Sequence, residues 1–120
     1  MRGWKWLLLA PFLINTGYAE EKIICSAIKA PAAVSVVNSQ LKLDKAKHCA
    51  VSCILSLDCP VGEVYIFGLM KEFADLLGAG KPELDDIKAN RIGISFFTTG
   101  RATNQQECLT ACIDYDWRQI

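Results

Sequence analysis

The sequence has no excess of charge of either sign, because 13 basic residues balance 13 acidic ones among 120 residues. A protein that binds nucleic acid through its phosphates needs a basic surplus, so this balance argues against a nucleic-acid partner. Histidine occurs once, and the chain has no paired-histidine metal motif, serine elbow, glycine-rich phosphate loop or dinucleotide fingerprint. No apolar run approaches the roughly 20 residues that a membrane-spanning helix requires. The absent motifs argue against the enzyme classes that they define. The length of the chain allows one small domain.

The first residues have the three parts of a secretory signal peptide. Two basic residues precede a short apolar run, and small residues, Gly17 and Ala19, stand at the positions that signal peptidase reads. We expect cleavage after Ala19, which gives a signal peptide over 1–19 and a single disulfide-braced helical domain over 20–120. The expected location is periplasmic or secreted, with no membrane span left after cleavage.

Six cysteines remain after this expected cleavage: Cys25, Cys49, Cys53, Cys59, Cys108 and Cys112. An even number of cysteines in a small exported chain indicates a disulfide framework. The second and third are four residues apart, as are the last two, so each of these pairs shares one face of a helix. Two antiparallel helices would then be joined by the rungs Cys49–Cys112 and Cys53–Cys108, which leaves Cys25 to pair with Cys59. This is one of the 15 pairings that six cysteines allow.

A zinc site that combines His48 with cysteine thiolates is the competing interpretation of these residues. The four-residue cysteine spacing fits zinc knuckles poorly, and export favours oxidation of the thiols. We therefore expect no metal and no other cofactor.

Prolines, glycines and capping residues divide the domain into helices. The expected helices cover residues 32–43, 45–57, 61–77, 82–94 and the stretch from a cap at Thr103 or Asn104 to about Tyr115. Pro31 is expected to open the first and Asp44 to cap the second, and Ser95–Thr99 is expected to be a short extended piece. The pattern predicts an all-α fold, a small disulfide-stabilised bundle of four to five helices.

The candidate site residues are His48, Glu72, Asp86 and Asn90. Asp44 lies four residues before His48 and shares its helix face, and Asp86 and Asn90 share a face in the same way. Gly93, one turn further on, has no side chain and would permit a close helix approach.

These residues form part of an ordered pattern: Asp44-Lys45-Ala46-Lys47-His48-Cys49 to Cys53, then Lys71-Glu72 with Asp75, then Asp86 to Gly93, then Cys108 and Cys112. The pattern resembles cysteine-containing helical domains at the C-termini of bacterial RHS-type polymorphic toxins and related small secreted proteins, over roughly residues 44–112. The resemblance implies an effector domain that acts in the bacterial envelope or on a competitor cell. It also implies that the four candidate residues form one site.

The sequence leaves the role of that site open. In one interpretation His48 is a general base oriented by Asp44 or Glu72, Asn90 donates to a developing oxyanion, and an envelope substrate is hydrolysed. In the other, these side chains satisfy one another and fix the register of the helices. A second function from a different class is a periplasmic immunity or inhibitor protein that neutralises a toxin by contact. The expected partner is accordingly a cognate toxin or immunity protein.

Overall fold

The structure is a computed structural model that describes residues 25–77 and 84–119, with side chains over 25–71 and 84–118. Residues 25–40 are helical, and they are followed by α2 (Asp44–Asp58), α3 (Val61–Leu77), α4 (Leu84–Thr98), α5 (Gln105–Asp114) and a final 3-10 turn, η1 (Trp117–Gln119). No strand occurs in these described ranges. The predicted small all-α, disulfide-stabilised bundle is confirmed. The predicted signal peptide, 1–19, lies outside the described residues.

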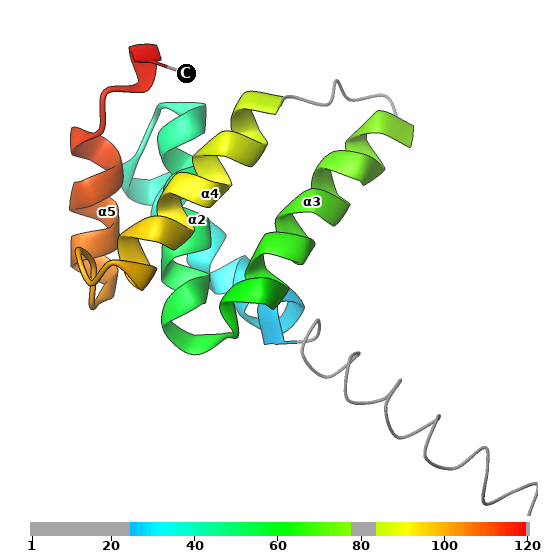
Figure 1. Ribbon diagram of the computed structural model, residues 1–120, viewed down its shortest axis with the longest axis horizontal. Helices are drawn as coiled ribbons and strands as arrows, with labels where there is room; N and C mark the ends of the chain where they lie inside the picture. Colours follow the sequence, from blue (N-terminus) through cyan, green and yellow to red (C-terminus); the bar gives the residue numbers. More distant parts are fainter. Residues whose placement is uncertain (1–24, 78–83, 120) are drawn as a thin grey trace, which may run out of the picture.

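The central helix of the bundle is α2, which packs against α3, α4 and α5. Figure 1 shows α3 and α5 on opposite sides of α4, with α2 passing behind α4. The buried face of α2 is built mainly from small residues, among them Ala46, Cys49, Ala50 and Cys53. Short side chains let the neighbouring helices come close, so the small residues of α2 explain why it can touch three of them at once.

The helices α2 and α4 approach each other closely at Gly93. A Cβ atom added to Gly93 would collide with the carbonyl oxygen of Cys49 and would stand 2.8 Å from its carbonyl carbon. The close helix approach expected at Gly93 is confirmed, and it sets the distance between the two helices that carry the candidate site.

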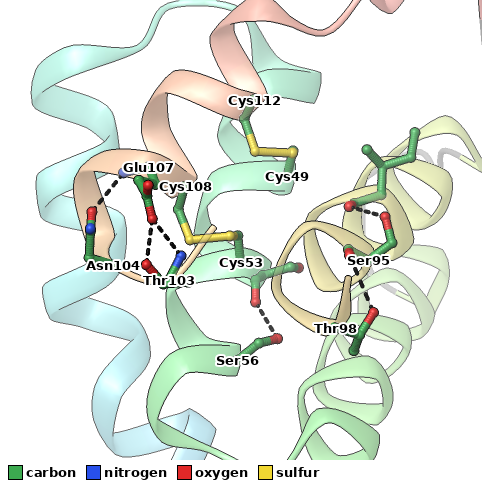
Figure 2. The surroundings of a disulfide bond; sticks show 12 residues. Cys49, Cys53, Ser56, Ser95, Thr98, Thr103, Asn104, Glu107, Cys108 and Cys112 are labelled. Carbon is green, nitrogen blue, oxygen red and sulfur yellow. Dashed lines mark hydrogen bonds between the residues drawn. A yellow bond between two sulfur atoms is a disulfide. The ribbon is translucent and has the colours of Figure 1, made fainter. Parts of the chain in front are cut away.

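Three disulfides hold the helices together, and all six cysteines take part. Cys49–Cys112 and Cys53–Cys108 join α2 to α5 as two successive rungs, with Cα–Cα distances of 5.8 and 5.6 Å (Figure 2). Cys25–Cys59 joins the first helical segment to the residue that ends α2. The predicted pairing is confirmed, and no thiolate remains to bind zinc.

The first helix is displaced from its prediction. It occupies residues 25–40 and not 32–43, so Pro31 lies inside it and does not open it. Two long-range links hold the earlier stretch in place: the Cys25–Cys59 disulfide, and a 2.6 Å hydrogen bond from the backbone N–H of Ser26 to the buried carboxylate of Glu63. Both links come from residues more than 30 positions away, which local sequence patterns do not report.

The predicted N-cap of α2 is also wrong. The helix includes Asp44, its N-cap is Leu43, and no side chain caps it. The backbone N–H of Lys47 bonds to the carbonyl of Leu43 at 3.0 Å, which places Asp44 within the first turn. A carboxylate in that turn is still favoured by the helix dipole.

The predicted extended piece, Ser95–Thr99, is wrong as well, because α4 continues to Thr98. Its aromatic and β-branched residues favour a strand locally, but Phe96 is buried in the core and only a helix brings it there together with the rest of the α4 face. The hydroxyls of Ser95 and Thr98 bond back to helix carbonyls (Figure 2), so they have partners without leaving the helix. Gly100, at φ 78°, then ends this stretch.

Asn104, one of the two predicted caps, starts α5. Its side chain accepts a 2.9 Å hydrogen bond from the backbone N–H of Glu107. In return the Glu107 carboxylate accepts from both the hydroxyl and the backbone N–H of Thr103, at 2.6 and 2.8 Å (Figure 2). These two bonds lower the pKa of Glu107 below its ordinary value of 4.5.

Candidate functional site

The only histidine lies between two carboxylates. Its Nε2 is 3.3 Å from Oδ2 of Asp86 on α4 and 3.6 Å from Oδ2 of Asp44, one turn earlier on α2. The side chains of His48 and Asp86 are only 15% and 9% exposed, whereas that of Asp44 is 69% exposed. A buried carboxylate interacts with an imidazole more strongly than a solvated one does, so Asp86 is the dominant partner.

The two helices meet through matching faces. Asp86, Asn90 and Gly93 follow one another at intervals of four and three, which places them on one face of α4. Each of them meets α2: the carboxylate meets His48, the amide meets Ser52, and the glycine meets the backbone beside His48. The close packing at Gly93 therefore brings Asp86 to the histidine.

Asn90 makes a buried hydrogen bond with Ser52. The serine hydroxyl donates to Oδ1 of Asn90 at 3.1 Å, and both residues are buried. On the other side, a Cβ added to Gly68 of α3 would stand 2.7 Å from Nδ2 of Asn90, so glycine there leaves room for the amide. Oδ1 of Asn90 accepts this bond, and the amide group Nδ2 is the donor of the side chain.

Ser52 is a site residue that the sequence analysis missed. The signal that could have revealed it is a polar line along α2, in which Asp44, His48, Ser52 and Ser56 recur every four residues. Ser52 and Ser56 are buried, and a repeated buried polar position on a core helix indicates a polar partner on the facing helix.

A cavity of about 340 Å³ lies beside His48 between the first helical segment, α2 and α3, and it opens to solvent. Aliphatic and aromatic side chains line most of it: Val34, Val37, Val51, Leu55, Val64 and Phe67. Its polar edge includes His48, Ser52 and Asn90, and the other polar or charged residues that border it are Asn38, Asp44, Lys47 and Lys71. Asp86 contacts His48 but does not line the cavity. The imidazole therefore borders both the cavity and the buried carboxylate.

The structure brings together three of the four predicted site residues. His48, Asp86 and Asn90 gather where α2 meets α4, and the expected pairing of Asp44 with His48 is present. Glu72 belongs to α3, but its side chain lies outside the described part, so its role remains a prediction.

Among the residues that the structure describes, two groups have the atoms that metal ions prefer. One ligand atom each from Asp44, His48 and Asp86 lie within 4.8 Å of one another, a set that could hold a divalent cation. Cys25, Cys59 and Glu63 are equally close, but both sulfurs of that second group are used by the disulfide. The same geometry suits a hydrogen-bonded imidazole, which can donate the N–H at Nε2 to these carboxylate oxygens.

Within the described ranges, none of the helices is both long enough and apolar enough to cross a lipid bilayer. Comparison with protein-family models, with curated proteins and with solved structures gave no match.

Proposed function

We propose that this chain is an exported effector domain of the polymorphic-toxin type, which hydrolyses a substrate in the bacterial envelope or in a competitor cell. The observation that carries the proposal is the position of His48, which borders the cavity while Asp86, from another helix, stands 3.3 Å from its Nε2. An imidazole held by a buried carboxylate at the edge of a pocket is suited to general acid–base chemistry. The sequence resemblance to RHS-type toxin domains and the three disulfides support the assignment to an exported effector.

The residues divide the reaction between them. His48 removes a proton from a water molecule in the cavity as the water oxygen attacks the substrate carbonyl carbon. The Asp86 carboxylate stabilises the imidazolium that forms, and Nδ2 of Asn90 donates to the carbonyl oxygen as it gains negative charge. The imidazolium then returns the proton to the leaving group as the carbonyl–leaving-group bond breaks, which restores neutral His48.

Growth of a bacterium that makes the protein in its periplasm tests this proposal. We expect production without any partner to slow growth, and His48→Ala and Asp86→Asn to relieve the effect. Asp85→Asn is the matched control, because Asp85 lies next to Asp86 but pairs with Lys45, at 3.7 Å, on a partly exposed surface. Circular dichroism and urea unfolding would confirm that each variant is folded. Unchanged toxicity in the folded His48→Ala protein would remove the histidine from the mechanism.

An immunity or inhibitor protein is the second candidate. Two large apolar side chains one turn apart on α3, Ile66 and Met70, are 47% and 53% exposed, and such a pair is suited to contact with another protein. This function predicts no toxicity, together with a protein that co-purifies from the native host. Ile66→Asp combined with Met70→Asp would then release that protein, whereas continued co-purification would exclude this surface.

A further inference from the structure

We propose that the cavity beside His48 binds a medium-length acyl chain whose polar end is anionic. The substrate of the hydrolase proposed above would then be an acyl ester or amide of that kind. The binding part of this inference depends only on the cavity, while the substrate assignment also rests on the proposed function.

The inner wall of the cavity suits hydrocarbon. Val34, Val51 and Phe67 line it from three different helices and are not fully buried, so a bound chain could cover the apolar surface that they still expose. The buried polar atoms at its edge belong to Ser52 and Asn90, which already bond to each other. A wall of this kind gives an ionic group nothing to replace its hydration shell, whereas an apolar chain gains from leaving water.

The size of the cavity limits the length of the chain. At about 30 Å³ for each water-sized group, a volume of about 340 Å³ holds roughly 11 such groups. That is the scale of one acyl chain of medium length, and it is at the lower end of the range for ligand pockets. Two long chains would not fit, so the cavity favours a single-chain amphiphile.

Positive charge at the border of the cavity selects the polar end. Lys47 lies one turn before Val51 on α2, and Lys71 lies one turn after Phe67 on α3, so both lysines stand next to apolar lining residues. Neither has an ion pair with a carboxylate among the described side chains, in contrast to Lys45, which pairs with Asp85. Asp44 also lines the cavity, but its carboxylate lies 3.6 Å from Nε2 of His48. The two lysines therefore outnumber one carboxylate at the border, which favours an anionic group attached to a chain that enters the cavity.

The same arrangement would place the bond to be hydrolysed next to His48. The imidazole lies one turn from Val51 along α2, next to Lys47 in sequence, at the border where the polar and apolar linings meet. The bond between an acyl chain and its polar end would be held at that border, within reach of the general base.

Isothermal titration calorimetry of the disulfide-bonded protein with dodecanoate, kept below its micelle concentration, tests the binding. We expect saturable one-to-one binding, at least tenfold weaker for butanoate and for dodecyltrimethylammonium. Ala30→Trp, which fills the cavity, should weaken dodecanoate binding at least tenfold, whereas Ala27→Trp on an exposed position of the same helical segment should not. Equal binding by these two variants would show surface adsorption and overturn the proposal.

Charge variants give a second test that does not disturb the core. Lys47→Glu combined with Lys71→Glu should weaken dodecanoate binding at least tenfold, while Lys88→Glu, exposed and outside this cavity, should leave it unchanged. Following the hydrolysis of a dodecanoyl ester beside the binding of dodecanoate, both with the unchanged protein, separates the two proposals. Binding without hydrolysis in the unchanged protein would refute the enzymatic function and keep the binding site. Absence of saturable binding would refute the acyl-chain site, whether or not the protein is a hydrolase.

Discussion

Removing the two rungs between α2 and α5 is expected to destabilise the protein by more than the two separate losses combined. The rungs close loops of 63 and 55 residues, and either one alone would contribute about 4 kcal/mol by restricting the unfolded chain. With one rung in place, however, the second closes a ring of only about ten residues, so each single removal costs about 2.7 kcal/mol. Removing both leaves the long loop open as well and costs about 7 kcal/mol.

The experiment is a cycle of four proteins: the unchanged chain, Cys49→Ala with Cys112→Ala, Cys53→Ala with Cys108→Ala, and all four substitutions together. Urea unfolding would be followed by circular dichroism, with sucrose present in every sample so that the least stable protein still folds. Loss of buried sulfur affects each rung and cancels in the comparison. We expect the combined loss to exceed the sum of the separate losses by about 1.5 kcal/mol. Strict additivity would show that the rungs do not act on one shared loop of the unfolded chain, and the reasoning would fail.

Three further predictions concern packing, pH and metals. Gly93→Ala should destabilise the protein by about 2 kcal/mol or more, because the new methyl group would collide with the backbone of α2. Gly62→Ala is the control: it has open space around it, and the urea midpoint should stay unchanged or rise. The lowered pKa of Glu107 means that its bonds to Thr103 stabilise the fold above pH 4.5 and that this stabilisation is lost as the pH falls through the lowered pKa. Thr103→Val should raise the pKa of Glu107 in an NMR titration, and an unchanged pKa would show that Thr103 does not cause the shift. If the proposed hydrolysis occurs, zinc should inhibit it by binding the imidazole nitrogen of His48, and EDTA should reverse the inhibition. Loss of hydrolysis on addition of EDTA alone would instead make the metal a cofactor.

The sequence analysis placed some helix boundaries wrongly where the local sequence favours a different structure from the one that forms. Ser95–Thr99 has the composition of a strand, yet Phe96 reaches the core only if α4 continues. Pro31 has the geometry of a helix start, yet Cys25 is tied to Cys59 and draws the earlier residues into the same helix. In each case a contact distant in sequence outweighed a local preference, which is about 1 kcal/mol for the strand-like residues and about 3 kcal/mol for a proline inside a helix.

The sequence by itself determined which residues share one face of a helix, because this depends only on their spacing along the chain. The repeated four-residue interval of the cysteines, together with the assumption that the two helices are antiparallel, led to the pairing that the structure has, because residues four apart share a face of a helix. The same interval put Asp44 beside His48, and the missing side chain at Gly93 indicated close packing.

Only the tertiary structure decided which groups from different helices meet. Asp86 reaches His48, and Ser52 reaches Asn90, because α2 and α4 pack closely at one particular rotation about their axes. The cavity likewise exists only where three helices leave a space between them. Periodicity tells which residues share a face of a helix, but the face that a helix turns toward its neighbour is set by the packing of all the side chains together.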